Sequence, residues 1–344
     1  MQMKKIGVLG AGTWGMALAR MLCNSGHQVT VWSAIEQEID QFSATRQHPN
    51  LPGMVIPEAV GFTKDMETVC RDKDILLFAV PSPFVRATAE KAAAYVTADQ
   101  VIVDVAKGIE ADTLFTMTQI IEDAIKKPGI RLVALSGPTH AEEVAKDLPT
   151  TIVSASADQA AAQLVQEVFS SGCMRVYTNE DVVGVELCGA MKNIIALAAG
   201  IATGLGCGDN TKAALITRGI AEIARLGTAM GCKEQTFGGL AGIGDLIVTA
   251  TSMHSRNNRC GMLLGQGVKP EEAIRQVGMV VEGINALPAA MRLKEMYGVE
   301  MPIVETVNAV VGGTAAVSDA VRMLMSRDQK PELPPSALDN HYDR

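Results

Sequence analysis

A glycine-rich turn near the start of this chain restricts its fold more than any other feature. A short apolar run ends in the motif GAGTWG at residues 10–15, and a helix-like pattern follows to Ser25. In this order of strand, turn and helix, Gly10 permits the tight turn, Gly12 lets a pyrophosphate approach the backbone, and Gly15 lets helix and strand pack closely. The helix start offers free N–H groups to phosphates. The pattern predicts a dinucleotide-binding turn, and the alternative is a glycine turn without a ligand.

The sequence does not decide which nicotinamide dinucleotide would bind. NAD enzymes often carry an acid at the end of the second strand, where it contacts the ribose 2′-hydroxyl. Here the predicted strand 28–33 runs into Ala34, and the first acid is Glu36, which is better explained as a solvated helix residue. No arginine stands there to receive a 2′-phosphate. We therefore expect NAD or NADP without a choice between them.

The N-terminal half alternates apolar runs with helix-like segments. Runs expected to form strands lie at 5–10, 28–33, 74–80, 101–106, 131–136 and 150–156. Helix-like segments lie at Thr13–Ser25, Phe84–Val96 and Gln159–Ser170. Continuous apolar strands that alternate with helices are typical of parallel sheets covered on both faces. The half is therefore predicted to be a Rossmann-type α/β domain with a doubly wound parallel sheet.

The sequence changes character near Asp181. Beyond it, strand-like runs nearly vanish, and alanine, leucine and methionine recur with helical spacing over 211–231, 258–265, 270–276, 285–297 and 302–311. An all-helical C-terminal domain is expected. We place the boundary in the turn 178–181, which gives a dinucleotide-binding domain at 1–180 and a substrate-binding domain at 181–330. Residues 331–344, rich in proline and polar residues, are expected to be a loose tail.

Composition and charge narrow the classes of protein. The chain has 344 residues, of which 48% are hydrophobic and 20% charged, so a globular core is expected. The net charge of −8 argues against nonspecific nucleic-acid binding, although a local basic pocket for an anion remains open. The apolar stretch 193–206 is too short and too rich in glycine to be a convincing membrane span.

Cysteine and histidine spacing gives no metal site. The seven cysteines are odd in number and form no Cys-x-x-Cys pair, and the five histidines form no His-x-x-x-His pair. Scattered cysteines of this kind fit reduced thiols. No signal peptide is recognisable, because the first apolar run ends in glycines. A cytoplasmic protein without metal is therefore expected.

One lysine, Lys192, stands alone in the apolar stretch 186–209. Burying an unpaired ammonium costs several kcal/mol, so such a lysine pairs with a carboxylate, lowers its pKa or reaches a cavity. All three outcomes favour acid–base chemistry. The alternative is a lysine whose stem covers apolar surface while its head reaches water. The stretch by itself favours that alternative.

Polar residues also follow two predicted strands, where ligands of doubly wound sheets bind. Lys107 follows the strand 101–106, and by location alone an ordinary surface lysine is equally probable. The loop 136–141 offers backbone N–H groups and the hydroxyl of Thr139. His140 in this loop could be catalytic, but it is better explained as a packed loop histidine, because the sequence shows no acidic residue placed to pair with it.

The helical half supplies two further candidates. Asp245 and Thr249 are four residues apart and would share a helix face, where the carboxylate could hold a buried lysine or a substrate hydroxyl, or cap the helix. The segment 255–257, Ser-Arg-Asn, precedes a helical run and combines a guanidinium, amide donors and a helix start, which suits a phosphate. Considered alone, that segment would be better explained as a solvated loop.

Taken together, these motifs resemble those of the NAD(P)-dependent glycerol-3-phosphate dehydrogenases of bacteria. The matching segments keep the family's order and span most of the chain: GAGTWGMALA at 10–19, FAVPS at 78–82, KGIE at 107–110, SGPTHAEEVA at 136–145, GAMKNIIALAAGI at 189–201, GDNTKAALITRG at 208–219, GLAGIGDLIVTATS at 239–252, SRNNR at 255–259 and VVEG at 280–283.

The resemblance implies a role for each matching residue. Lys192 matches the proton donor and acceptor. Substrate contacts are implied at Lys107, Gly137, Thr139, Lys192, Asp245, Ser255, Arg256 and Asn257, with the phosphate on Arg256 and Asn257. Beside the glycines Gly10, Gly12 and Gly15, cofactor contacts are implied at Thr13, Trp14, Lys107, Ala141, Arg256, Val280 and Glu282. Asn193 and Thr249 are expected to support the site.

The implied activity is the NAD(P)-dependent interconversion of sn-glycerol 3-phosphate and dihydroxyacetone phosphate, which supplies glycerol 3-phosphate for glycerophospholipid synthesis. Lys192 would need its pKa lowered by about 2–3 units to act near neutral pH. Burial and the like charge of Lys107 would lower it, and Asp245 would oppose them, so Asp245 is expected to orient more than to tune. Many bacterial members carry a basic residue where this chain has Ala34, which weakens the case for NADP.

Two other functions stay open. A β-hydroxyacid dehydrogenase acting on a small 3-hydroxy acid also pairs a Rossmann domain with a helical domain and a lysine, but the segment 255–257 argues for a phosphate rather than a carboxylate. A nonenzymatic nicotinamide-nucleotide sensor would need the glycine turn but not Lys192, Lys107 and Arg256. The methionine- and alanine-rich helical half could support a homodimer, and a buried core accounts for it equally well.

Overall fold

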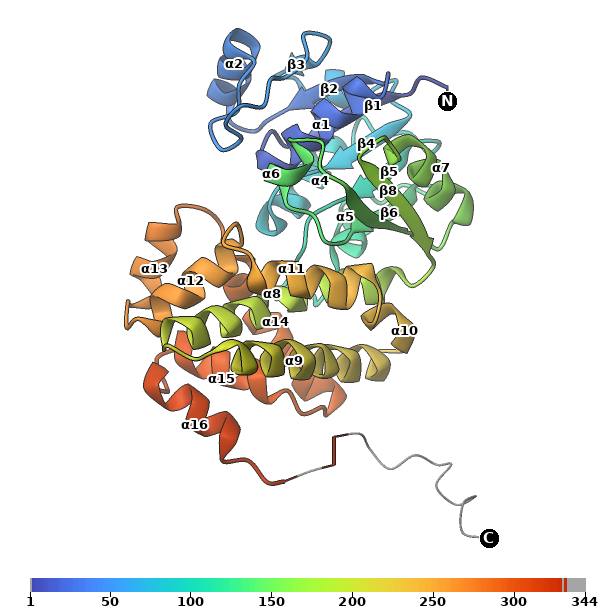
Figure 1. The fold of residues 1–344 in the computed structure, drawn as a ribbon. Coiled ribbons are helices and arrows are strands. Elements are labelled where there is room, and N and C mark those ends of the chain that lie inside the picture. The colour runs from blue at the N-terminus through green and yellow to red at the C-terminus, as the bar shows by residue number, and fades with distance from the viewer. Residues whose placement is uncertain (1, 330, 333–344) are drawn as a thin grey trace.

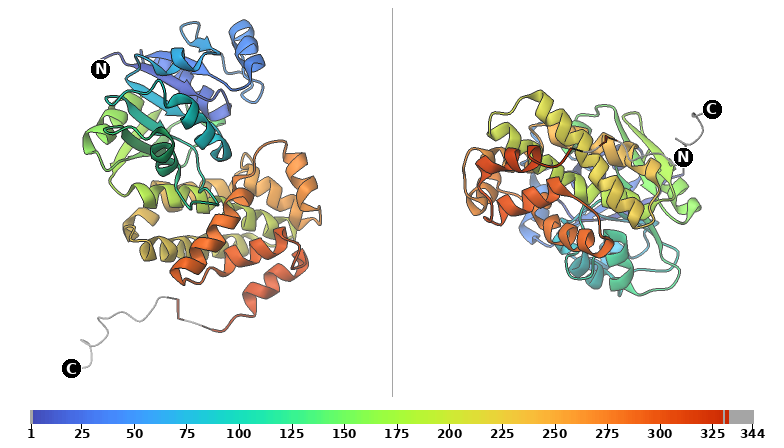
Figure 2. Two further views of the ribbon diagram at one scale, coloured as in Figure 1. Left: turned by 180° about the vertical axis from the view of Figure 1, so that it is seen from behind. Right: turned by 90° about the horizontal axis from the view of Figure 1, so that it is seen from below.

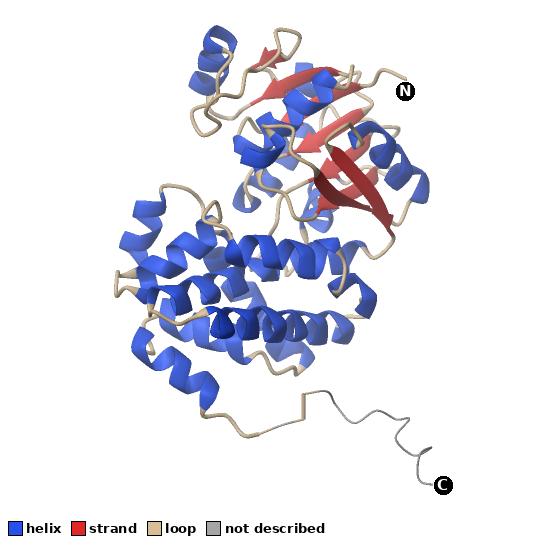
Figure 3. Ribbon diagram, viewed as in Figure 1, coloured by secondary structure: helices blue, strands red, loops and turns tan. Residues whose placement is uncertain are grey.

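The computed structural model describes residues 2–329 and 331–332 and places a sheet-containing half against a helical half (Figure 1). Figure 3 shows that the strands lie in the N-terminal half only. The last strand ends at Asn179, and the first long helix of the second half begins at Val182. Residues 333–344 of the expected tail lie outside the described residues.

The sheet has eight strands in the order β3-β2-β1-β4-β5-β6-β7-β8. Their bounds are β1 Lys5–Leu9, β2 Gln28–Trp32, β3 Gly61–Thr63, β4 Ile75–Phe78, β5 Val101–Asp104, β6 Arg131–Ser136, β7 Thr150–Ala155 and β8 Met174–Asn179. All six predicted strands are present, and β3 and β8 were not predicted. The order reverses at β1, which lies between β2 and β4, so the sheet is doubly wound.

One pair of strands departs from the predicted parallel sheet. β6 and β7 pair antiparallel, whereas every other neighbouring pair is parallel. The connection between these two strands contains only the short helix α6 Ala141–Val144. A parallel connection needs a crossover that usually includes a longer helix, so the chain turns back instead. The prediction of a parallel sheet is therefore right for most of the sheet and wrong for this pair.

Helices cover both faces of the sheet because successive strand residues point to opposite sides. Val8 and Leu77 pack on one face with α1, α6 and α7, while Leu9 and Phe78 pack on the other with α3, α4 and α5. The helices of this half are α1 Thr13–Asn24, α2 Glu36–Thr45, α3 Met66–Cys70, the 3₁₀ turn η1 Ser82–Phe84, α4 Val85–Ala92, α5 Met117–Ile125, α6 and α7 Gln159–Phe169.

The C-terminal half is helical, as predicted, and is built around α8. Its elements are α8 Val182–Gly204, α9 Asp209–Ala229, α10 Glu234–Phe237, the π-turn η2 Leu240–Gly244, α11 Asp245–Thr251, α12 Arg256–Gly265, α13 Pro270–Val277, α14 Glu282–Tyr297, α15 Pro302–Val311, η3 Val317–Asp319 and α16 Ala320–Met325. The five helices predicted by spacing correspond to α9 and to α12–α15. The short helices α10 and α16 were not predicted.

Glycines bring α12 against α8 at backbone distance. A Cβ atom on Gly200 would lie 2.2 Å from the Asn258 carbonyl oxygen, and one on Gly261 would lie 2.2 Å from the Leu197 carbonyl oxygen. Gly204 and Gly265 meet in the same way one turn further along. This contact fixes the start of α12 beside the middle of α8.

The apolar character of α8 comes from its position in the core. The helix is long and apolar enough to cross a membrane by length and composition, but 89% of its most apolar window is buried inside the protein. A mostly buried helix of this kind is typical of a protein core. The same core accounts for the apolar composition of the helical half. A homodimer stays a prediction.

Candidate active site

The ends of two strands meet the helical half where several predicted site residues lie. Lys107 follows β5, and Gly137 and Thr139 follow β6. These neighbouring parallel strands end at the same edge of the sheet. Figure 2, left, shows the loops of this edge facing the helical half. Gly189 of α8 packs against this edge, because a Cβ there would lie 3.4 Å from the Lys107 side chain.

Two lysines share one buried carboxylate. Lys107 Nζ lies 2.6 Å from Asp245 Oδ2, and Lys192 Nζ lies 3.1 Å from Asp245 Oδ1. Asp245 is only 1% exposed. The Lys107 ammonium also donates to the Gly137 carbonyl at 3.0 Å and to Thr139 Oγ1 at 3.5 Å. The fold therefore brings predicted site residues from both halves together around the Asp245 carboxylate. This carboxylate does not cap α11, which was the alternative role for it.

Lys192 is buried and does not reach water. The residue is 5% exposed, so the alternative of a lysine whose head reaches water does not hold. Its ammonium donates to Thr249 Oγ1 at 2.6 Å, and Thr249 Oγ1 in turn donates to the Asp245 carbonyl at 2.6 Å. Thr249 and Asp245 share a face of α11 because they are one helical turn apart, as their spacing predicts.

Burial lowers the pKa of Lys192 to about 8. Desolvation is the largest cause, because it disfavours the charged form. Asp245 opposes it by attraction, and the positive charges of Lys107 and Arg256 add to the lowering. These directions agree with those expected from the sequence. A lysine with such a pKa can both hold and release a proton near neutral pH.

Arg256 brings a second cation to the same region. It is the first residue of α12, and among the described residues its guanidinium has no hydrogen bond or ion pair. Burial lowers its pKa, while the nearby charges of Glu282 and Glu142 act in the opposite direction. An arginine fork without a protein partner, at the start of a helix, suits an anionic ligand such as a phosphate.

Ser255 and Asn257, on either side of Arg256, are engaged within the protein. Ser255 caps α12, because its hydroxyl accepts a hydrogen bond from Asn258 N at 3.2 Å. Asn257 Oδ1 accepts from Gly283 N at 2.9 Å, and Asn257 Nδ2 donates to Asn193 Oδ1 at 2.9 Å. Asn193 therefore supports Asn257, beside Lys192. One N–H of the Asn257 amide is left for a ligand.

The glycine turn divides into structural and open positions. Gly10 has φ of +122°, and a Cβ there would lie 2.7 Å from the Ala79 carbonyl group. A Cβ on Gly15 would lie 2.3 Å from the Gly10 oxygen. At Gly12, by contrast, a Cβ would meet nothing within 4 Å. Gly12 is thus not needed for packing, and its open backbone leaves room for a ligand to approach, as the sequence predicts.

The start of α1 fits a dinucleotide. No side chain caps this helix, so its first N–H groups are available to phosphate oxygens. The hydroxyl of Thr13 is buried and has no hydrogen-bond partner. Trp14, next to it, is half-buried. An orphaned hydroxyl beside uncapped N–H groups is what a bound pyrophosphate would satisfy.

Glu282 connects the two halves in a way that the sequence does not predict. Its carboxylate accepts hydrogen bonds from Ser82 N at 3.1 Å and from Ser82 Oγ at 2.6 Å. Ser82 follows β4, whereas Glu282 begins α14. Val280 lies in the preceding turn and is half-buried, and Ala141 is buried at the start of α6. No local motif marks Ser82, because its partner is 200 residues away.

His140 lies at the same edge of the sheet. Its Nε2 is 3.4 Å from the Val248 carbonyl oxygen, and its ring is tilted against His254 with 5.7 Å between centroids. Burial is the main cause that lowers its pKa. The histidine packs in a loop, and among the described residues it makes no hydrogen bond to Lys192 or Asp245, although the charge of Lys192 also lowers its pKa.

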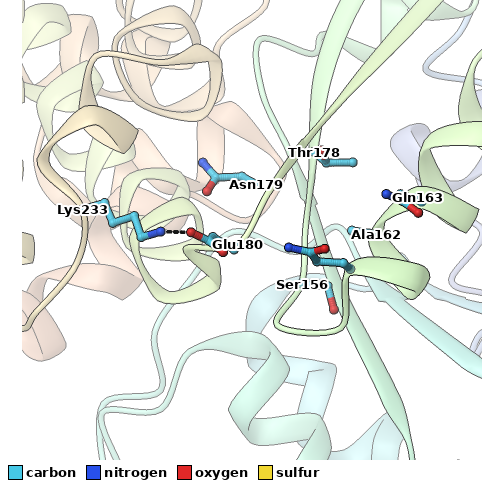
Figure 4. Close-up of a pocket in the computed structure, with 8 residues that line it drawn as sticks. Ser156, Ala162, Gln163, Thr178, Asn179, Glu180 and Lys233 are labelled. Atoms are coloured by element: carbon cyan, nitrogen blue, oxygen red, sulfur yellow. Dashed lines mark hydrogen bonds and ion pairs between the residues drawn. The ribbon is translucent and has the colours of Figure 1, made fainter.

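A polar pocket of about 400 Å³ lies elsewhere between the two halves (Figure 4). Thr178 and Asn179 line it from β8, Gln163 from α7, and an ion pair between Glu180 and Lys233 stands at its edge. None of the predicted site residues lines this pocket. The lysine cluster, not this pocket, therefore brings the candidate residues together.

Two family models cover most of the chain. Residues 5–162 match the model of the NAD-dependent glycerol-3-phosphate dehydrogenase N-terminus, and residues 181–322 match that of the C-terminus. Among curated proteins, the chain is 64% identical to glycerol-3-phosphate dehydrogenase [NAD(P)+] 2 of Lactobacillus delbrueckii subsp. bulgaricus, over 96% of this chain and 99% of the relative. It is 51% identical to glycerol-3-phosphate dehydrogenase [NAD(P)+] of Agathobacter rectalis, over 96% and 98%.

Solved structures with a similar fold include members of the same family. The crystal structure of glycerol-3-phosphate dehydrogenase from Coxiella burnetii has a TM-score of 0.90 and 34% identity, covering 94% of this chain and 99% of that one. A ketopantoate reductase from Ralstonia eutropha has a TM-score of 0.62 at 16% identity, which shows a shared fold alone.

Proposed function

Because the chain belongs to the NAD-dependent glycerol-3-phosphate dehydrogenase family, we propose that it interconverts sn-glycerol 3-phosphate and dihydroxyacetone phosphate with NAD or NADP. The glycerol 3-phosphate would supply glycerophospholipid synthesis in the cytoplasm. The observation that carries the proposal is the buried cluster of Lys192, Asp245 and Lys107 beside the unpaired guanidinium of Arg256.

Residues 1–180 would bind the cofactor, and residues 181–330 would bind most of the substrate. Bound NAD(P) supplies or accepts the hydride. The open backbone at Gly12, the uncapped start of α1 and the orphaned hydroxyl of Thr13 would hold its pyrophosphate. Trp14, Ala141, Val280 and Glu282 are the remaining proposed cofactor contacts, with Lys107 and Arg256 shared between cofactor and substrate.

The substrate phosphate would bind Arg256 and the free N–H of the Asn257 amide, near the helix start that Ser255 caps. The three-carbon part would then extend toward the strand ends, where Gly137, Thr139 and Lys107 lie. Asp245 holds Lys107 and Lys192 on its two oxygens, so it keeps both ammonium groups on one side of the substrate. This positioning reduces the entropy that must be lost in the reaction.

Lys192 would transfer the proton. In the reductive direction its ammonium protonates the substrate oxygen, and in the oxidative direction its neutral amine accepts the hydroxyl proton. Since its pKa is lowered to about 8, the rate of reduction should fall as pH rises through that value, and the rate of oxidation should rise. Thr249 accepts a hydrogen bond from Lys192 and so orients the ammonium.

The replacement Lys192→Ala tests the proposal. Turnover of dihydroxyacetone phosphate with NADH or NADPH should fall by about 10²–10⁴-fold, the usual contribution of general acid–base catalysis. NADH binding, followed by fluorescence, should persist. The control Lys212→Ala removes a lysine that lies on α9 and pairs with exposed Asp209, and it should leave turnover unchanged. Near-normal turnover of Lys192→Ala would exclude the proposed role.

A substrate panel separates the proposal from its alternatives. A β-hydroxyacid dehydrogenase would oxidise small 3-hydroxy acids, and a nonenzymatic nucleotide sensor would not oxidise NADH when dihydroxyacetone phosphate is added. The matched curated relatives are named as glycerol-3-phosphate dehydrogenases, which supports neither alternative. We expect consumption of NADH or NADPH with dihydroxyacetone phosphate, and no formation of NADH or NADPH when small 3-hydroxy acids are given with NAD or NADP.

A further inference from the structure

We propose that Glu38, held by Ser33 at the end of β2, selects NAD over NADP by placing a carboxylate where the 2′-phosphate of NADP would lie. The inference rests on the proposed dinucleotide site and deepens it. Sequence alone offered Glu36 as the first acid after this strand and left the choice of cofactor open. The structure assigns the role to a different glutamate.

The end of β2 lies beside the glycine turn. Gly10 N donates to the Trp32 carbonyl at 2.8 Å, and Leu9 and Trp32 are paired in the sheet. In doubly wound folds the adenosine ribose of a bound dinucleotide lies at this strand end, one strand away from the pyrophosphate turn. The residues that follow Trp32 are therefore the ones that meet the ribose.

Ser33 brings the Glu38 carboxylate to this position. Its hydroxyl donates to Glu38 Oε2 at 2.6 Å and accepts a hydrogen bond from Ile35 N at 3.1 Å, so its orientation is fixed. Ser33 is only 6% exposed, while Glu38 is half-buried. Within the described part of the chain, Glu38 Oε1 has no hydrogen-bond partner and is available to a ribose hydroxyl. The carboxylate comes from the first turn of α2 rather than from the strand itself.

The neighbouring cations are committed to other partners. Lys64 pairs with Asp40 at 2.8 Å and with Glu36 at 3.6 Å. The Arg46 guanidinium donates to the Val60 carbonyl at 2.8 Å and lies over the ring of Phe62. Neither is left free to receive a phosphate. Neither Lys64 nor Arg46 therefore neutralises the negative charge of Glu38.

His48 adds no positive charge at neutral pH. Burial lowers the pKa of this histidine, although its hydrogen bond to the Ala11 backbone and the charge of Glu38 act in the opposite direction. The ring stacks on Phe42 and accepts a hydrogen bond from Asn50 N at 3.1 Å. A 2′-phosphate, with a charge of about −1.5 to −2 at neutral pH, would thus meet a carboxylate and no free cation.

Steady-state kinetics and ligand binding test this assignment together. In the unmodified protein, kcat/KM with dihydroxyacetone phosphate should be at least about tenfold higher for NADH than for NADPH, because one close like charge changes affinity by that order. By calorimetry, 2′,5′-ADP should bind at least about tenfold more weakly than 5′-AMP, which lacks only the 2′-phosphate. The replacement Glu38→Gln should reduce both ratios by about tenfold, mainly by improving NADPH and 2′,5′-ADP.

The control Glu36→Gln removes the same charge from the same turn of α2. Glu36 is exposed and pairs with Lys64, not with Ser33, so this variant should change either ratio by less than about threefold. Equal effects of the two variants, or a preference of the unmodified protein for NADPH, would overturn the role of Glu38. The calorimetry needs no turnover, so it reads the cofactor preference even if the proposed reaction fails.

Discussion

The two sides of the candidate site bind by different means. On the sheet side, backbone groups at the glycine turn and the strand ends face the site, and Gly12 is open because it has no side chain. On the helical side, charged side chains are buried: Lys192 and Asp245 form an ion pair, and Arg256 has no hydrogen-bond or ion-pair partner among the described residues. Adding an atom therefore disturbs the first side, whereas removing a charge disturbs the second.

After Lys192→Ala, the replacement Asp245→Asn should have the largest effect. It leaves the ammonium groups of Lys107 and Lys192 without their shared carboxylate, so turnover should fall by about 10²–10³-fold and the thermal midpoint should drop. Because Asp245 raises the pKa of Lys192, its loss should move the pH profile of reduction below about 8. Rates measured across pH check this, and an upward shift would contradict the charge assignment.

On the sheet side, Gly10→Ala and Gly12→Ala should separate folding from binding. Gly10→Ala forces a side chain into left-handed backbone and against Ala79, so it should lower the free energy of unfolding by about 3 kcal/mol. Gly12→Ala should change stability by less than about 1 kcal/mol but weaken NADH binding at least about tenfold. Denaturant unfolding and fluorescence titration measure the two effects. Equal loss of stability in both would contradict the distinction.

The difference between the two sides also explains what the sequence could predict. Strand, glycine turn and helix form one local pattern, so the Rossmann half and the role of Gly10 could be inferred. The apolar stretch around Lys192 by itself favours a snorkelling lysine, so the burial of Lys192 was expected only once the resemblance was considered. The antiparallel pair β6–β7 was missed because strand direction depends on the connection, which the apolar runs do not show.

Contacts between segments that lie far apart in the sequence could not be predicted either. Ser82 and Glu282 are brought together only by the packing of α14 against the sheet side, and neither residue type signals the partnership. Glu38 was missed for a local reason. The acid lies within the next helix, and only the rotamer that reaches Ser33 brings it to the strand end.

A buried acid in the helical half provides a test of stability against pH. Glu222 accepts hydrogen bonds from Ile303 N and Val304 N at the start of α15, yet burial raises its pKa to about 7. A raised pKa means that the folded state holds the proton more tightly. Its contribution to stability is complete below the unfolded value of 4.5 and is lost as pH rises through about 7.

The replacement Glu222→Gln removes this titration. Relative to the unmodified protein, the variant should gain about 2 kcal/mol in unfolding free energy between about pH 5 and about pH 8. The buried acids Asp104 and Glu186, whose pKa values burial also raises, are present in both proteins and cancel in the comparison. Urea unfolding at several pH values measures the difference. Parallel curves would contradict the assignment.

The smallest loss of activity is expected at the contact between the sheet side and the helical side, where Ser82 meets Glu282. Ser82→Ala removes one hydrogen bond to Glu282, the donor at 2.6 Å, and leaves the bond from the Ser82 backbone in place. A hydrogen bond to a charged group contributes about 1.5–3 kcal/mol, but this one is only partly buried and water can replace it. We therefore expect kcat/KM to fall by about three- to tenfold with little change in stability. The control Ser171→Ala removes a hydroxyl that, among the described residues, accepts hydrogen bonds only within its own loop, from Cys173 N and Met174 N, and an equal loss there would show that Ser82 does not position Glu282.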